Sequence, residues 1–93
     1  MANPSFNLEI LTPRKRIFSG EISSLVAPGE LGYLGVLANH APLVSTLLPG
    51  KVTLRETSGG TQVLQSLGEG LLEVYHDRVT LLLDEVGTTT PER

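Results

Sequence analysis

The chain has 93 residues, enough for one domain with a small core, and no cysteine, which excludes disulfides and thiolate metal sites. Seven basic and ten acidic residues give a net charge of −3, which argues against an electrostatic grip on nucleic-acid phosphates or anionic lipid. No uncharged apolar run reaches the roughly 20 residues that cross a bilayer, and no secretory signal begins the chain, so we expect a soluble, cytoplasmic domain.

The first third of the chain predicts two strands. Residues 1–5 are expected to be a disordered leader. Residues 6–11 alternate apolar and polar side chains, as a half-buried strand does, until Pro13 ends the pattern. A turn at Ser19 and Gly20 is predicted to precede a second strand at residues 22–27, which Pro28 and Gly29 would end. Alternation in that strand places residues 22, 24 and 26 on one face and residues 23, 25 and 27 on the other.

The central stretch, residues 31–50, is almost free of charge, and His40 is its only ionisable residue apart from tyrosine. Its spaced glycines and prolines predict a strand–loop–strand segment, because these residues favour tight turns. We call the polar loop at residues 39–42 the knuckle. Alternation can bury only about half of the apolar side chains around it. The remainder is therefore expected to form a surface patch for a partner.

The second half of the chain has clearer strand signals. Strands are predicted at residues 51–57, 61–67, 71–75 and 78–84, with either Val63 or Leu64 toward the core. Turns are predicted at residues 58–60, 68–70 and 76–77. No window shows the spacing of an amphipathic helix. An all-β sandwich or barrel is therefore expected over residues 6–87, followed by a polar tail at residues 88–93.

The two histidines do not have the spacing of a metal site, so no metal is expected. His76 lies beside Asp77 at a predicted hairpin tip and is interpreted as part of a solvated turn. His40 has two interpretations that the sequence leaves open: it stabilises the knuckle through a hydrogen bond, or it contacts a partner.

Catalysis is not expected from this chain. The carboxylate pairs Glu69/Glu73 and Asp84/Glu85 resemble those of glycosidases only in composition, and their alternation with Leu and Val is typical of solvent-facing strand residues. No nucleophile elbow or phosphate-binding loop is present. The basic cluster at residues 14–16 lacks the interleaved aromatic residues of a groove for single strands. A free-standing β-barrel module that binds nucleic acid, similar to an OB fold, is the alternative function.

Residues 32–43, reading GYLGVLANHAPL, and the following Pro49 and Gly50 closely resemble the epsilon subunit of F-type ATP synthases. Residues 68–74, reading GEGLLEV, and the strand at residues 78–84 resemble it as well. The likeness extends over about residues 6 to 86 in one register. It implies a flattened β-sandwich of about ten short strands.

The resemblance also implies a function. The chain would be a non-catalytic rotor subunit that links the gamma subunit to the c-ring of the membrane sector and couples ion transport to ATP synthesis. It would lie at the cytoplasmic face of the bacterial inner membrane as a peripheral part of the complex. No cofactor, nucleotide, nucleic acid or bilayer insertion is expected.

The family pattern assigns two sets of interface residues. The set facing the gamma subunit would be Thr12, His40, Pro42, Leu43 and Ser45. The set facing the c-ring would be Glu30, Leu31, Gly32, Tyr33 and Leu34.

Three features depart from the family pattern. Tyr33 stands where many members carry an acidic residue, for which Glu30 could substitute, and Ala38 replaces a common proline before the knuckle. Most members continue into a C-terminal pair of helices, whereas this sequence ends at Arg93. We therefore expect either a naturally short or a truncated chain that neither inhibits by helix insertion nor binds nucleotide.

Overall fold

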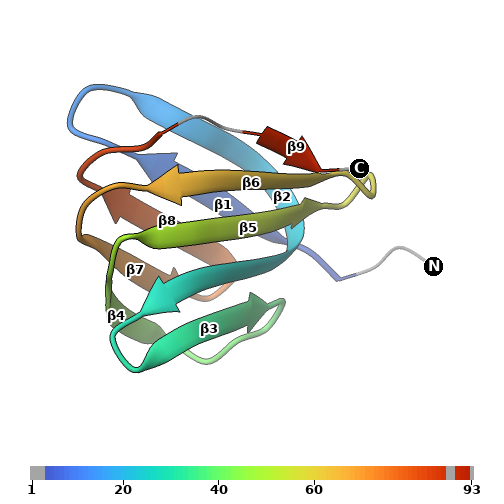
Figure 1. The fold of residues 1–93 in the computed structure, drawn as a ribbon. Coiled ribbons are helices and arrows are strands. Elements are labelled where there is room, and N and C mark those ends of the chain that lie inside the picture. Colours follow the sequence, from blue (N-terminus) through green and yellow to red (C-terminus); the bar gives the residue numbers. More distant parts are fainter. Residues whose placement is uncertain (1–3, 88–89, 93) are drawn as a thin grey trace.

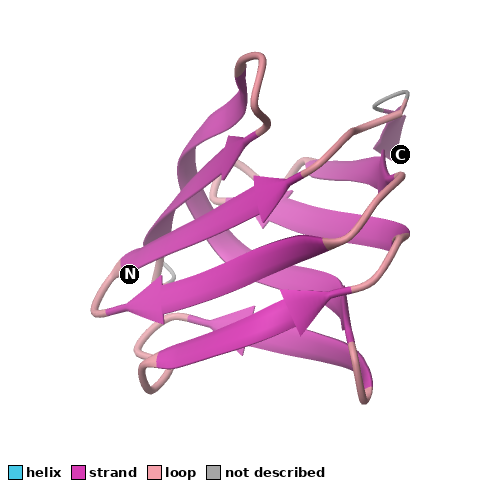
Figure 2. Ribbon diagram, turned by 90° about the vertical axis from the view of Figure 1, so that its left-hand side faces the viewer, coloured by secondary structure: helices cyan, strands magenta, loops and turns pink. Residues whose placement is uncertain are grey.

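The computed structural model describes residues 4–87 and 90–92. These residues form nine strands and no helix (Figures 1 and 2), which confirms the all-β prediction. The strands are β1 (Phe6–Leu11), β2 (Arg16–Gly29), β3 (Gly32–Leu37), β4 (Leu43–Leu47), β5 (Gly50–Glu56), β6 (Thr61–Ser66), β7 (Gly70–Tyr75), β8 (Arg78–Leu83) and β9 (Thr90–Glu92). Of the predicted leader and tail, residues 1–3, 88–89 and 93 lie outside the described residues, and β9 pairs with β6.

The strands form two layers that share the long strand β2. One layer has the order β1-β8-β7-β4, in which β1 and β8 are parallel. The other has the order β3-β2-β5-β6-β9. The first half of β2 pairs with β1 and the second half with β3 and β5, so β2 bends from one layer into the other (Figure 1). This is the flattened sandwich that the resemblance implies.

Three sequence predictions about strand β2 are wrong. The turn predicted at Ser19 and Gly20 is wrong, because pairing of Gly20 with Leu8 of β1 keeps both residues in the strand. Pro28 does not end the strand either, and the turn comes at residues 30–31. The carbonyl of Pro28 accepts a hydrogen bond from the N–H of Leu48 (2.8 Å), on the side away from β3. The missing N–H of Pro28 therefore costs β3 no hydrogen bond.

The third correction concerns which side chains of β2 face the core. A register shift between Ile22 and Ser24 interrupts the alternation. Ile22, Leu25 and Ala27 are consequently all buried, although uninterrupted alternation would place Ile22 on the face opposite to the other two. Sequence periodicity cannot locate such a bulge, because the partner strand determines it.

The core lies between the two layers and consists of apolar side chains, and Ser66 is the one buried polar residue among those that the structure describes. The sequence left open whether Val63 or Leu64 faces the core, and in the structure Leu64 is the buried one of the two. Ser66 donates a hydrogen bond from its Oγ to the carbonyl of Gly68 (3.1 Å). The buried apolar residues are Phe6, Leu8, Ile10, Ile22, Leu25, Ala27, Val36, Leu47, Val52, Leu54, Leu64, Leu72, Val74, Val79, Leu81 and Leu83.

The connections between strands gather at two opposite ends of the sandwich. The Thr12 end, at the left in Figure 1, contains the connections at residues 12–15, 30–31, 48–49 and 67–69. The His40 end contains the knuckle and the turn at residues 76–77, because Leu43 pairs with Val74 and Tyr75 pairs with Arg78. A six-residue strand is about 20 Å long, so residues at opposite ends lie about that far apart.

Candidate functional site

The β2–β3 turn at the Thr12 end presents the most exposed apolar side chain of the described residues. Leu31 has an exposed fraction of 105%, and Glu30 beside it is exposed as well. A shallow hollow of about 590 Å³ lies between this turn and β4. Its lining residues are Gly29, Glu30, Leu31, Gly32, Tyr33, Leu34, Val44, Ser45 and Thr46. The five residues of the predicted ring-facing set therefore line one hollow, together with Ser45 of the predicted gamma-facing set.

Tyr33 is fixed by a hydrogen bond within the domain. Its phenolic oxygen accepts from the main-chain N–H of Lys51 (3.1 Å), while 60% of the residue remains exposed. A Cβ at Gly50 would lie 2.9 Å from that oxygen and 3.1 Å from Pro28, so this contact requires glycine at position 50. Tyr33 thus has a hydrogen-bond partner within the domain.

The knuckle at the opposite end is a tight polar turn. Asn39 adopts a left-handed conformation (φ 66°), which asparagine tolerates better than most residues. The Nδ1 atom of His40 lies 2.7 Å from the carbonyl oxygen of Ala41. Because a carbonyl only accepts, Nδ1 must carry the proton in this contact. The structure therefore supports the turn-stabilising interpretation of His40, and Nδ1 is already engaged within the loop.

Both histidines line one hollow, which the sequence analysis did not foresee. The hollow has a volume of about 410 Å³ and is lined by Asn39, His40, Ala41, Pro42, His76 and Asp77. It arises because β4 and β7 are paired, which aligns the knuckle with the β7–β8 turn. His76 is exposed in that turn at φ 58°, with its ring edge-on to Tyr75 (4.2 Å between centroids). The prediction of a solvated turn at residues 76–77 is confirmed.

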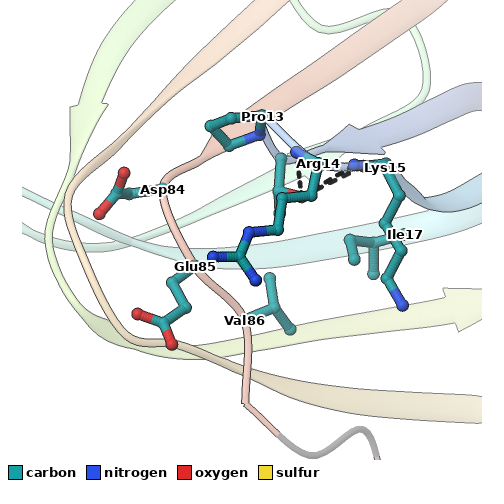
Figure 3. A pocket seen from close by; sticks show the side chains of 8 residues that line it. Pro13, Arg14, Lys15, Ile17, Asp84, Glu85 and Val86 are labelled. Carbon is teal, nitrogen blue, oxygen red and sulfur yellow. Dashed lines mark hydrogen bonds between the residues drawn. The ribbon is translucent and has the colours of Figure 1, made fainter.

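Thr12 lies at the other end of the molecule from His40, directly after β1. Its Oγ1 accepts hydrogen bonds from the N–H groups of Arg14 and Lys15 and donates to the carbonyl of Lys15, each at 3.3 Å. Figure 3 shows the adjoining hollow of about 470 Å³, across which the Arg14 side chain extends toward Glu85. The hollow combines Arg14 and Lys15 with Asp84 and Glu85, so its charges balance. The hydroxyl of Thr12 mainly stabilises its own turn.

An apolar row on the outer face of the β1-β8-β7 layer was missed by the sequence analysis. Leu11 pairs with Leu82, and Leu82 pairs with Leu71, so the three side chains lie side by side. Leu71 and Leu82 are 37% and 46% exposed, and the hollow beside them measures about 570 Å³. The consecutive leucines at residues 71–72 and 81–83 were the available signal, because alternation cannot bury all of them.

Two site types are not found in the part of the chain that the structure describes. Within residues 4–87 and 90–92, no three His, Cys, Asp or Glu residues are arranged to hold a metal ion. The same residues include no helix with the length and apolarity needed to span a membrane.

Comparison with known families gives a match over almost the whole chain. Residues 5–88 match the family described as ATP synthase, Delta/Epsilon chain, beta-sandwich domain. The ATP synthase epsilon chain of Dichelobacter nodosus is 44% identical over 85 residues, which are 91% of this chain and 58% of that one. The ATP synthase epsilon chain of Chlorobaculum tepidum is 42% identical over 85 residues, which are 91% of this chain and 96% of that one. The chain thus spans about three fifths of the D. nodosus relative and nearly all of the C. tepidum relative.

Solved structures show the same fold. A chain in the mitochondrial ATP synthase of Euglena gracilis, in a structure of OSCP, F1 and the c-ring, superposes with a TM-score of 0.84. It is 19% identical, and the match covers 98% of this chain and 56% of that chain. A chain in the central stalk and c-ring of Tetrahymena thermophila mitochondrial ATP synthase superposes with a TM-score of 0.75 at 15% identity, covering 94% of this chain and 69% of that one.

Proposed function

Because the chain belongs to the family of ATP synthase delta/epsilon-chain β-sandwich domains, we propose that it is a non-catalytic subunit of the rotor of a bacterial F-type ATP synthase. In this proposal it links the gamma subunit to the c-ring and couples ion transport to ATP synthesis. It acts as a peripheral part of the complex at the cytoplasmic face of the inner membrane. The observation that carries the proposal is the family match over residues 5–88.

The architecture suits a part that transmits force. The core is continuous between the two layers, and β2 belongs to both of them. Among the described residues, no buried side-chain nitrogen or oxygen lacks a hydrogen-bond partner. Close-packed interiors of this kind have low compressibility and transmit strain. A load applied at one end of the sandwich would therefore reach the other with little deformation.

The proposed gamma-facing set is spread over the length of the molecule. His40, Pro42 and Leu43 lie at the His40 end, Ser45 lies within β4, and Thr12 lies at the opposite end. A partner that touches all five must extend along the sandwich for about 20 Å. We propose that the knuckle and Leu43 make the principal contact, because they adjoin each other at the His40 end, whereas Thr12 lies alone at the opposite end.

The proposed ring-facing set forms a surface with little charge. Leu31 projects from the tip of the turn, and Glu30 is the one ionisable carboxylate among the residues of that hollow. The apolar side chain of Leu31 can be buried against a partner without the cost of desolvating and pairing a charge. We propose that Leu31, rather than Tyr33, makes the main contact with the ring.

The nucleic-acid alternative has less support than the rotor function. The charge of −3 has the wrong sign for phosphate, and the exposed features described above are apolar or balanced in charge. No observation on the structure favours it.

The proposal is tested by titrating the purified gamma subunit with the chain and with the double variant His40→Ala/Leu43→Ala. We expect the double variant to bind at least tenfold more weakly, because interface energies concentrate in a few central residues. The control is Gln65→Ala/Leu67→Ala, which also removes one polar and one leucine side chain but lies on the other layer. Unchanged affinity of the His40/Leu43 variant, with its thermal unfolding also unchanged, would sink the assignment of the knuckle to gamma.

A further inference from the structure

Strand β3 has one edge that no other part of the described chain covers. It pairs with β2 in an uninterrupted antiparallel register, from Ser24 opposite Leu37 to Gly29 opposite Gly32. No other strand pairs with it, and no further main-chain or side-chain hydrogen bond to β3's main chain is found among residues 4–87 and 90–92. The second edge of β3 therefore presents main-chain groups to solvent.

The hydrogen-bond pattern of β2 shows which main-chain N–H and C=O groups of β3 lie on its free edge. The carbonyl of Pro28 accepts from Leu48, so the main-chain groups of Pro28 point away from β3. Pro28 and Tyr33, which lie opposite each other, are therefore a non-hydrogen-bonded pair. Hydrogen-bonded pairs alternate with such pairs, so Leu34 and Val36 bond to β2. The N–H and C=O groups of Tyr33, Gly35 and Leu37 consequently point to the free edge.

This edge lacks the features that usually prevent an exposed sheet edge from pairing with another strand. Natural edges are short, carry charged residues or proline, or are twisted by a bulge. Strand β3 has six residues, GYLGVL, with no charge, no proline and no register shift. The opposite edge of the same layer is protected differently, because β9 has three residues and contains Pro91.

The side chains on the outer face of β3 are also suited to a partner. Tyr33 and Leu37 are 60% and 64% exposed, and Gly35 between them is exposed as well. The strand runs from the turn with Leu31 to the knuckle, so it joins the two surfaces described above. An added strand would continue an interface that begins at the knuckle.

We propose that β3 binds an extended segment of the gamma subunit as an additional strand, with main-chain hydrogen bonds to Tyr33, Gly35 and Leu37. This inference rests on the proposed function, which supplies the partner. Stable interfaces bury about 1,600 Å², and a strand about 20 Å long provides only part of that area. Self-pairing of two β3 edges is therefore too small by itself, whereas a partner that also covers the knuckle gains the rest. Main-chain pairing supplies affinity in strand addition of this kind.

The test is amide hydrogen exchange of the chain, free and bound to purified gamma. In the free chain, we expect fast exchange at Tyr33, Gly35 and Leu37 and slow exchange at Leu34 and Val36. In the complex, the three edge amides are expected to slow at least tenfold. Gly35→Pro removes the edge N–H, leaves the β2 pairing intact and is expected to weaken binding at least tenfold. Gly35→Ala is the matched control, because its Cβ would lie 3.9 Å from the nearest atom and the N–H remains.

The outcomes separate the inference from the proposed function. A complex in which the edge amides keep exchanging rapidly overturns strand addition and leaves the proposed function standing. Failure of the wild-type chain to bind gamma contradicts the proposed function and the inference with it. If exchange of the three edge amides slows in the chain alone as its concentration rises, the β3 edges of two copies pair with each other. That result overturns the assignment of the edge to gamma.

Discussion

The phenolic oxygen of Tyr33 accepts a hydrogen bond from the main-chain N–H of Lys51, and this contact joins two strands that are not neighbours in the sheet. The side chain passes over Pro28 of β2 to reach the start of β5. A residue that the family pattern assigns to the ring surface thus also fixes the local structure of that surface.

Tyr33→Phe is expected to lower the free energy of unfolding by about 1 kcal/mol, because the Lys51 N–H loses its acceptor. Chemical denaturation measures the change. Tyr75→Phe is the matched control, since it removes the hydroxyl of an equally exposed tyrosine that has no such contact among the described residues. Equal stabilities of the two variants would show that the Tyr33 bond contributes nothing.

Thr12→Val is expected to lower the free energy of unfolding by about 1 kcal/mol, because the hydroxyl serves the turn at residues 12–15. Thr12→Ser keeps the hydroxyl and should retain most of the stability. The comparison uses denaturation of both variants together with their affinity for gamma. Loss of affinity in Thr12→Val without loss of stability would assign Thr12 to the interface instead of the turn.

Gly70→Ala is expected to be strongly destabilising, by about 1–3 kcal/mol. A Cβ there would lie 2.6 Å from the carbonyl oxygen of Leu82 and 2.8 Å from Leu83, and the first of these is main chain and cannot move aside. Thermal unfolding of Gly70→Ala is compared with that of Gly35→Ala, which has space for the added methyl group. A Gly70→Ala variant as stable as Gly35→Ala would mean that the close approach of β7 and β8 is not required.

Leu31→Ser is expected to leave stability unchanged, because the side chain is fully exposed. In a reconstituted ATP synthase it should reduce ATP-driven ion pumping more than it reduces binding to gamma. Leu67→Ser, at another exposed leucine of the same end, is the control. If both variants pump like the wild type, Leu31 does not contact the ring.

The sequence predicted those parts of the fold that depend on local alternation and turn chemistry. The strands predicted at residues 51–57, 61–67, 71–75 and 78–84 and the turns predicted at residues 58–60 and 76–77 are confirmed. The path of β2 was not predictable in the same way. Its Ser-Gly and Pro-Gly pairs have turn composition, but pairing with β1 and β3 keeps them extended. The hydrogen bonds of β2 with β1 and β3 therefore outweigh the turn preference of these residue pairs.

The interface predictions likewise differ between residues that adjoin in sequence and residues that only strand pairing positions. The ring-facing residues were contiguous in sequence, and the structure brings them together around one hollow. The gamma-facing residues came from three segments, and the structure separates Thr12 from His40 by the length of β1. Their relative placement depends on strand pairing, which no single stretch of sequence encodes. The free edge of β3 could not be predicted for the same reason. Whether a strand lies at the edge of a sheet depends on which other strands pair with it.

A titration of purified gamma subunit with the wild-type chain, monitored by calorimetry and by sedimentation of the mixture, tests the proposed rotor function most directly. We expect saturable binding and a complex with one copy of each chain. Absence of a complex at micromolar concentrations of both proteins would contradict the assignment of this domain to the rotor.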